Sequence, residues 1–347
     1  MSSDARTVAS PRKLILHIGS DKAGSTALQM HLAANRDLLS RQGVYLPKIG
    51  GAGVTGHHGA LLQDFNAESI ADLVSEIDER PLDDIVLMSW EGIHILGEEP
   101  LQRLRSVFEG CSFHIIFYIR EQADVIQSGY LQQVKSQEKS ALSIFADIDQ
   151  SPANRDYYQT LKKFERIFDG CTSDVVLYHR ENFPEKNIVY DFFQRLTGAI
   201  DFREVTTYKS EINTSLSLQD VYALAQMEDL HPELLQDDNR GLKSRVIDLL
   251  LSGNVVTPRD LPAQFLDREQ VERIRAFFRQ SNLSLVREYG VDATLLSGQR
   301  PVWRDEAHAA PGDVADLDFC TQELDNVLKL ARTPYMDKDS RARYDIP

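Results

Sequence analysis

The sequence predicts an α/β protein with a parallel sheet flanked by helices and a helical extension at its C-terminal side. Short apolar segments alternate with segments of helical periodicity over roughly the first 210 residues, which is typical of strands joined by crossover helices. Beyond residue 213 the apolar residues recur every three to four positions, which indicates helices. The length of 347 residues suits such a core with a helical addition.

Five apolar segments are expected to form the strands of this sheet. The fourth reads FHIIFYI, a nearly continuous apolar run with β-branched and aromatic residues, as in a buried parallel strand. The five segments are residues 13–18, 44–46, 85–89, 113–119 and 174–178. Helices are expected between them, at 25–43, 121–135 and 157–168.

Composition divides the chain into four stretches. We expect residues 1–12 to be a flexible tail and residues 13–210 to be the α/β core. Residues 211–297 are expected to form a helical extension packed on that core, and residues 298–347 are a polar segment with one helix near 317–330. Within the extension, helical periodicity recurs at 216–227, 241–251 and 268–289.

Charge and apolar content exclude several classes of protein. The net charge of −15 and the pI of about 5.1 disfavour nonspecific binding to nucleic acid or to an anionic membrane face. No apolar run approaches the ~20 residues of a membrane span, and the first 12 residues lack the apolar segment of a signal peptide. We therefore expect a cytoplasmic protein without a transmembrane segment, whose oligomeric state the sequence does not indicate.

The cysteines also favour a cytoplasmic protein. There are three, at wide spacing and without a CxxC pair, and they are Cys111, Cys171 and Cys320. This number and spacing disfavour a disulfide framework and a zinc site, and they fit a reducing compartment.

The segment at residues 14–29, LILHIGSDKAGSTALQ, carries the strongest functional signal. An apolar strand runs into a loop bounded by Gly19 and Gly24, which allow a tight turn with exposed backbone N–H groups. Lys22 adds a mobile positive charge inside that loop. Two hydroxyl residues open the following helix, where an anion is favoured, and they are Ser25 and Thr26.

The order of these residues distinguishes two kinds of phosphate loop. A Walker A loop places its lysine directly before the hydroxyl residue, whereas here Ser25 follows Gly24 and Lys22 lies further back. The order resembles the 5′-phosphosulfate loop, Lys-Thr-Gly-Ser/Thr-Ser/Thr, of sulfotransferases that use 3′-phosphoadenosine 5′-phosphosulfate (PAPS). Ala23 departs from that pattern, while Lys22, Gly24, Ser25 and Thr26 match it. A solvated turn is the alternative reading of this segment alone.

A second motif follows the fourth expected strand. That strand ends in Arg120, and Ser128 comes eight residues later within an expected helix. The order of strand, arginine, helix and serine resembles the sulfotransferase motif whose arginine and serine hold the 3′-phosphate of the nucleotide. A salt bridge at Arg120 and a solvated Ser128 are the alternative, which is less favoured when both motifs occur in this order.

Two later segments extend the resemblance to about residue 290. Asn213 and Ser215, in INTSLSL, resemble an Asn-x-Ser element of many bacterial members, although they would also suit an ordinary helix cap. The segment FFRQSNLSLVREYG at 277–290 resembles the closing helix of the family.

Transfer from PAPS to an acceptor requires a general base that takes the proton of the acceptor, and the sequence offers three candidates for it. His57 and His58 lie in the glycine-rich segment 50–59, and histidine is the commonest proton acceptor near neutral pH. Glu91 follows an expected strand at the edge where ligands bind in open α/β sheets, and the family uses either residue type. We favour the two histidines over Glu91 by a narrow margin, and we interpret His17, inside the first strand, as a satisfied core residue.

The resemblance implies a P-loop-like fold and transfer of a sulfuryl group from PAPS to a hydroxyl or amine of an acceptor, with carbohydrate or glycolipid as the acceptor class and without a metal. Lys22 is the expected stabiliser of the leaving phosphate oxygen. Two other functions stay open: a P-loop kinase or other Mg-dependent phosphoryl transferase, and a nucleotide-binding module without catalysis.

Overall fold

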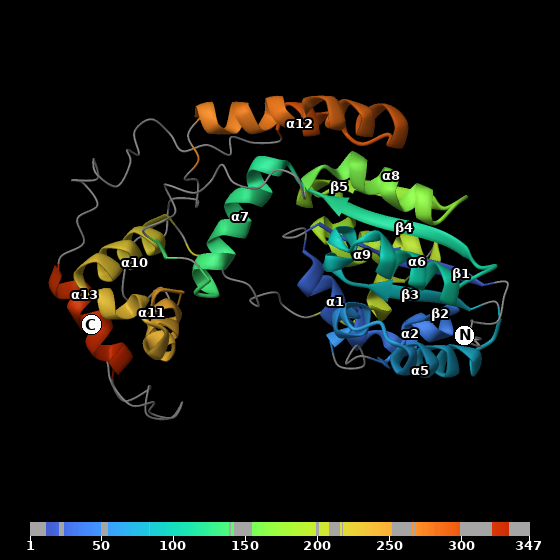
Figure 1. The fold of residues 1–347 in the computed structure, drawn as a ribbon, viewed down its shortest axis with the longest axis horizontal. Coiled ribbons are helices and arrows are strands. Elements are labelled where there is room, and N and C mark those ends of the chain that lie inside the picture. Colours follow the sequence, from blue (N-terminus) through green and yellow to red (C-terminus); the bar gives the residue numbers. More distant parts are fainter. Residues whose placement is uncertain are drawn as a thin grey trace. The chain divides into compact units, whose positions relative to one another are not determined.

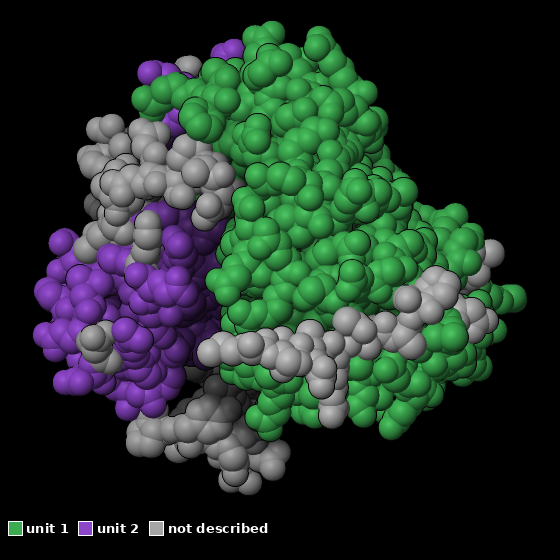
Figure 2. Space-filling model, turned by 45° about the vertical axis from the view of Figure 1, so that its right-hand side comes forward, with its two compact units in different colours: residues 1–125, 151–212, 272–301 green, residues 126–150, 213–271, 302–347 purple. Residues whose placement is uncertain are grey.

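The computed structural model describes most of the chain and divides it into two compact units (Figure 2). The first unit contains residues 1–125, 151–212 and 272–301, and the second contains 126–150, 213–271 and 302–347. The described residues are 12–20, 24–49, 55–82, 84–138, 140–141, 155–198, 201–207, 216, 218–251, 266, 268–298 and 321–332.

The first unit is built on a five-stranded parallel sheet with the strand order β2-β3-β1-β4-β5 (Figure 1). The prediction of an α/β fold with a parallel sheet flanked by helices is confirmed. The strands are β1 (Lys13–His17), β2 (Val44–Tyr45), β3 (Ile85–Ser89), β4 (Ser112–Ile119) and β5 (Thr172–Leu177).

Helices cover both faces of this sheet and bury alternate strand residues. On one face, Leu14, Leu16 and Phe117 pack in a core with helices α4 (Gly59–Gln63), α5 (Ala67–Asp78), α6 (Glu98–Val107) and α8 (Tyr157–Ile167). On the other, Ile15 and Tyr118 pack with α1 (Ser25–Ala34), α2 (Arg36–Arg41) and α9 (Ile188–Thr197). Burial on both faces explains why β4 reads as an unbroken apolar run.

Two element boundaries differ from expectation for physical reasons. The helix after β1 begins at Ser25 as expected but is interrupted at Asn35, whose side-chain amide donates to the His31 and Thr206 carbonyls, both at 2.8 Å. β5 begins two residues earlier than its apolar run, because Thr172 and Ser173 pair with β4 at its partly exposed start.

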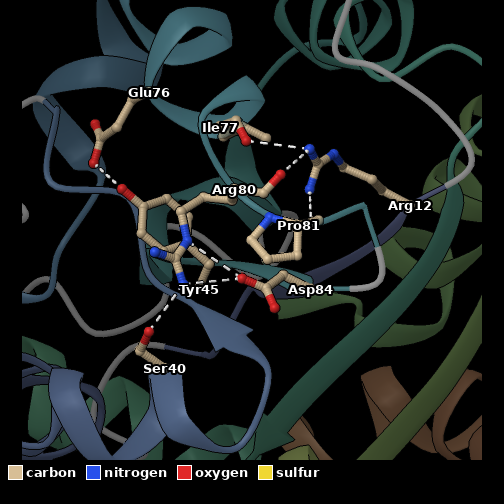
Figure 3. A network of polar contacts seen from close by, with 8 residues as sticks. All are labelled: Arg12, Ser40, Tyr45, Glu76, Ile77, Arg80, Pro81 and Asp84. Atoms are coloured by element: carbon tan, nitrogen blue, oxygen red, sulfur yellow. Dashed lines mark hydrogen bonds and ion pairs between the residues drawn. The ribbon is translucent and has the colours of Figure 1, made fainter.

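The amino edge of the sheet carries a network of paired polar groups (Figure 3). Arg12, which is buried, donates to three backbone carbonyls where α5 ends. Nearby, Tyr45 donates to Glu76 at 2.6 Å, and Arg80 binds Asp84. The polar side chains drawn in Figure 3 therefore have their partners within the network itself.

The carboxyl edge is where the loops after β1, β3, β4 and β5 begin. Parallel strands end at the same edge, and ligands of open α/β sheets bind there. Backbone hydrogen bonds continue past the strands at this edge, from Ser20 N to Tyr118 O at 2.8 Å and from Trp90 N to His17 O at 3.1 Å. These bonds fix the starts of the loops that carry the candidate site.

The second unit is helical. Its core contains residues of α10 (Leu218–Leu230), α11 (Arg240–Leu251), α13 (Thr321–Arg332) and the later part of α7 (Gln122–Lys135), which begins in the first unit. A buried ion pair joins Lys243 to Glu228 at 2.7 Å. The long helix α12 (Arg268–Tyr289) also belongs to both units by sequence.

The sequence-based domain boundaries stay a prediction. The expected tail lies outside the described residues except for Arg12, as does most of the polar C-terminal segment. Among the helices that the structure describes, none is both long enough and apolar enough to cross a membrane.

Candidate anion site at the carboxyl edge of the sheet

The loop between β1 and α1 has the backbone of an anion-binding turn. Gly19 and Gly24 have φ values of 23° and 82°, a region that residues with a side chain rarely adopt. Gly24 is the N-cap of α1, and as a glycine it has no side chain to cap the helix. The N-cap residue itself thus leaves the first amides of α1 uncapped at the positive end of the helix, where an anion is stabilised.

The sequence-predicted residues of this loop are described in part. Ser25 is buried, and its hydroxyl lies 3.5 Å from the Ser20 carbonyl oxygen. Thr26 lies in the first turn of α1, but its side chain is outside the described part of the structure. Lys22 and Ala23 also lie outside the described residues, so their assigned roles stay predictions.

His17, interpreted from sequence as a satisfied core residue, is satisfied on one side only. Its side chain is buried, and Nδ1 lies 2.8 Å from Ser89 Oγ on β3. Nε2 is also buried and has no hydrogen-bond partner in the described part of the chain. Burial lowers the pKa of His17 to about 3, so the ring is neutral at physiological pH.

Tyr157 is a second buried polar group near this loop. It begins α8, and its hydroxyl lies beside Ser20 and the backbone of Arg120, yet no described atom meets hydrogen-bond geometry with it. Burial raises the pKa of Tyr157 to about 12. Sequence reasoning missed this residue, because nothing in the helix start of α8 distinguishes it from a core tyrosine.

Arg120 lies at the end of β4, as predicted, and close to the start of α1. Its guanidinium lies 5.6 Å from the centre of the Tyr178 ring, and a Cβ on Gly24 would lie 3.4 Å from that same ring. Arg120 also forms an ion pair with Asp124, four residues later. The salt bridge of the alternative reading is therefore present.

The described residues do not test the other expected nucleotide-binding residues. Ser128 lies half-buried on α7, in the part that belongs to the second unit, whereas Arg120 belongs to the first. Asn213 and Ser215 lie outside the described residues. The assignment of these three residues to the nucleotide stays a prediction.

Glu91 follows β3 at the same edge. Gln29, buried on α1, donates its amide to Glu91 Oε2 at 2.8 Å. The other carboxylate oxygen, Oε1, has no partner among the described residues, and the side chain is half-exposed. Gln29 thus fixes a carboxylate that keeps one oxygen for a proton or a substrate hydroxyl.

His57 lies beside the Trp90 ring, with ring centres 6.1 Å apart in an edge-on arrangement. The glycines around it make room, because a Cβ on Gly59 would come within 2.2 Å of the His57 ring. The Gly59 amide donates to His57 Nδ1 at 3.1 Å. In the neutral ring Nε2 therefore carries the proton, and the one lone pair is already used.

His58 is fully buried and holds two strand ends together. The Ser89 amide donates to Nδ1 at 3.1 Å, and Nε2 lies 3.2 Å from the Pro47 carbonyl oxygen, which it meets as donor. Burial lowers the pKa of His58 to about 4. Both nitrogens are engaged with backbone, so no lone pair faces a substrate.

No group of His, Cys, Asp and Glu residues suited to a metal ion occurs among the residues that the structure describes. The groups that the carboxyl edge offers to a ligand are the start of α1, the Arg120 guanidinium, the buried neutral side chains of His17 and Tyr157, and the Glu91 carboxylate.

Comparison with known proteins does not assign this chain to a family. No protein-family model matches the sequence. The chain is 31% identical over 180 residues to an uncharacterized protein of Archaeoglobus fulgidus, a match that covers 50% of this chain and 45% of that protein. The chain thus spans less than half the length of that relative.

Among solved structures, the chain is similar to a sulfotransferase from Alicyclobacillus acidocaldarius. The TM-score is 0.42 and the sequence identity 13%, with 84% of this chain and 100% of that chain covered. A likeness of this size carries no functional argument, so the proposal below depends on the residues of this chain.

Proposed function

We propose that this protein is a sulfotransferase that moves a sulfuryl group from PAPS to a hydroxyl or amine of an acceptor. The observation that carries the proposal is the start of α1, where Gly24 is the N-cap, has a positive φ and offers no side chain to cap the helix. This arrangement favours an anion. The order of Lys22, Gly24, Ser25 and Thr26 supports a phosphosulfate as that anion, through the resemblance given above.

The nucleotide is proposed to lie along the carboxyl edge from β1 to β4. Lys22, Ala23 and the first turn of α1 would hold the 5′-phosphosulfate. Arg120 and Ser128 would hold the 3′-phosphate, and the Tyr178 ring, which lies near both the Arg120 guanidinium and Gly24, supports the part of Arg120 in this. Asn213 and Ser215 are proposed to contribute to the same nucleotide site, on the resemblance alone.

The proposed reaction is an in-line displacement at sulfur. The acceptor oxygen or nitrogen attacks, the bond between sulfur and the 5′-phosphate oxygen breaks, and adenosine 3′,5′-bisphosphate leaves. Lys22 would stabilise the charge on the leaving oxygen, and a base takes the proton of the acceptor. Positioning and electrostatics supply most of the rate enhancement in such a transfer.

Glu91 is the base that the geometry favours. His57 has its lone pair occupied by the Gly59 amide, and His58 has both nitrogens engaged with backbone. Glu91 has one oxygen fixed by Gln29 and one without a described partner. We therefore propose Glu91 as the base, whereas the sequence narrowly favoured the two histidines.

We propose a carbohydrate or glycolipid acceptor, on the resemblance alone, and a cytoplasmic location, which the wide spacing of the three cysteines supports. The proposed site contains no metal ion. Sulfuryl transfer should thus proceed in the presence of a chelator.

The test uses the full chain with ³⁵S-labelled PAPS and EDTA, offered in turn to fractionated glycans, glycolipids, small metabolites and proteins. Transfer of label to one fraction supports the proposal. Transfer of the γ-phosphate of labelled ATP that requires Mg²⁺ would indicate the phosphoryl transferase instead. Tight binding of adenosine 3′,5′-bisphosphate with no transfer to any fraction would indicate a binding module.

A further inference from the structure

His17 has a buried nitrogen that the fold leaves without a partner. The side chain is 1% exposed, and Nε2 has no hydrogen-bond partner in the described part of the chain. The rings of Tyr118 and Phe192 contact the imidazole edge-on, with ring centres 6.0 Å and 5.0 Å away. Unpartnered buried polar atoms are rare in folded proteins, and each needs an explanation such as a ligand.

The direction of this nitrogen is toward the start of α1. A Cβ on Gly19 would lie 3.2 Å from His17 Nε2 and 2.9 Å from Ser25 Oγ. The nitrogen and the first hydroxyl of α1 therefore face the same side of the Gly19 turn. Gly19 is the residue that leaves this space open, because any side chain there would fill it.

The hydrogen bonds of Ser89 determine which nitrogen carries the proton. If Nδ1–H donated to Ser89 Oγ, the Ser89 hydroxyl proton would lack an acceptor, because Ser89 is fully buried and its hydroxyl bonds only to His17 among the described residues. Nε2 would then be an unpaired acceptor as well. If Ser89 donates to Nδ1, the only unpaired group is Nε2–H, so this tautomer is favoured.

We propose that the neutral His17 donates Nε2–H to an anionic oxygen bound at the first turn of α1. A donor fits this place, because the helix start attracts negative charge and the uncapped amides there are donors too. The inference rests on the proposed function, in which that oxygen belongs to the 5′-phosphate or sulfate of the nucleotide. His17 thus adds a binding residue to the site, beside the Gly19 turn.

Two substitutions separate the two nitrogens of His17. His17→Asn places an amide near the Nδ1 position, where it keeps the bond to Ser89, but leaves nothing at Nε2. His17→Gln places an amide donor near the Nε2 position. A hydrogen bond to a charged group is worth a change of about 10- to 100-fold in affinity. His17→Asn should weaken binding of adenosine 3′,5′-bisphosphate by that factor, and His17→Gln should restore most of it.

A second nucleotide locates the effect. Adenosine 3′-phosphate lacks the 5′-phosphate, so its affinity should be the same for the unaltered chain and for His17→Asn. Calorimetric titration of both nucleotides measures this, and circular dichroism checks that both variants fold. Equal effects of Asn and Gln on both nucleotides would show that His17 acts only through packing and would overturn the inference.

The unaltered protein provides a test that needs no variant. In ¹⁵N-histidine NMR spectra, the Nε2 of His17 should carry the proton, and its signal should move when adenosine 3′,5′-bisphosphate saturates the site. A proton on Nδ1, or an Nε2 signal that stays in place at saturation, overturns the inference while the proposed function stands. Absence of nucleotide binding by the unaltered chain overturns both.

Discussion

The two edges of the parallel sheet differ in how completely their polar groups are paired. At the amino edge, the polar side chains bind one another and the ends of helices (Figure 3). Glu76 accepts from Tyr45 and from two backbone amides, and Arg80 binds both Asp84 and Ser40. At the carboxyl edge, His17 Nε2 and the Tyr157 hydroxyl are buried without a partner in the described residues.

We interpret the paired groups of the amino edge as stabilising the fold, and the unpaired groups of the carboxyl edge as available to a ligand. A buried polar group that is paired contributes to folding, whereas an unpaired one lowers stability by about 1 to 3 kcal/mol. A fold that tolerates such a loss at the edge where ligands bind has a use for it there. Substitutions at the amino edge should therefore reduce stability, and substitutions at the carboxyl edge should reduce binding or turnover.

The largest effect is expected at Glu91. Glu91→Gln keeps the acceptor for the Gln29 amide but removes the oxygen that takes a proton, so turnover should fall by about 100- to 10,000-fold. The affinity for PAPS should stay within about twofold, because the interaction between Glu91 and Gln29 persists. Single-turnover rates and equilibrium titration measure the two quantities.

His57→Gln is the matched variant, since it replaces the rival base at the same edge. It should retain most of the turnover, because His57 Nδ1 already accepts from the Gly59 amide. If His57→Gln lost turnover while Glu91→Gln retained it, His57 would be the base and the hydrogen bond to Gly59 would have to open during the reaction.

The second expected effect is on stability, at the amino edge. Arg12→Met keeps the aliphatic stem but removes the donors to the carbonyls of Ile77, Arg80 and Pro81. The free energy of unfolding should fall by about 3 kcal/mol, since three bonds to a buried charged group are lost near the end of α5. Urea denaturation measures it, and the affinity for adenosine 3′,5′-bisphosphate should not change.

The control for this prediction is an exposed arginine. Arg203→Met removes an ion pair with Asp201 on the surface, where solvent screens the charges, so the free energy of unfolding should stay nearly unchanged. An equally small loss for Arg12→Met would show that the amino-edge network does not stabilise the fold, and the contrast between the edges would fail.

The sequence predicts the sheet well because burial determines its pattern. β4 is buried on both faces and reads as a continuous apolar run, so its position was predicted to within one residue. The break between α1 and α2 was not predicted, because it depends on Asn35 binding the carbonyl of Thr206, which is 171 residues away. Long-range partners of polar residues leave no periodic signal in the sequence.

The same limit explains what was predicted of the site. The loop after β1 was recognised from its glycines, which have the positive φ that the turn requires. The sequence does not distinguish His57 from His58. The bonds of His58 to Ser89 and Pro47 show that His58 is the buried, structural ring, whereas His57 is the accessible one. His17 was rightly expected in the core, but its unpaired nitrogen depends on Ser89, 72 residues away.

A third prediction concerns the free energy of unfolding at acid pH, which the buried histidines of the carboxyl edge should lower. His17 and His58 have pKa values lowered by burial to about 3 and about 4, against 6.5 when exposed. Between pH 6.5 and about 4 the unfolded chain therefore binds more protons than the folded chain, so stability falls as the pH falls through this window. The loss is about 1.4 kcal/mol per pH unit for each histidine.

Urea denaturation at pH 7, 6 and 5 tests this, with His17→Gln beside the unaltered chain. The variant should lose stability less steeply, because one of the two histidines is gone. Identical slopes for both proteins would show that His17 does not stay neutral in the folded state.

The smallest expected effect compares two ion pairs of the same type, one at each edge. Arg120 pairs with Asp124 and Arg80 with Asp84, each four residues apart in the chain. Asp124→Asn removes a negative charge beside the proposed anion site and breaks the ion pair with Arg120. Affinity for adenosine 3′,5′-bisphosphate should rise by roughly fivefold, about 1 kcal/mol for partly exposed charges. Asp84→Asn should leave that affinity unchanged and lower stability, because Arg80 loses its partner. An unchanged affinity in Asp124→Asn would place Arg120 with the structural arginines of the amino edge, whatever the rest of the site binds.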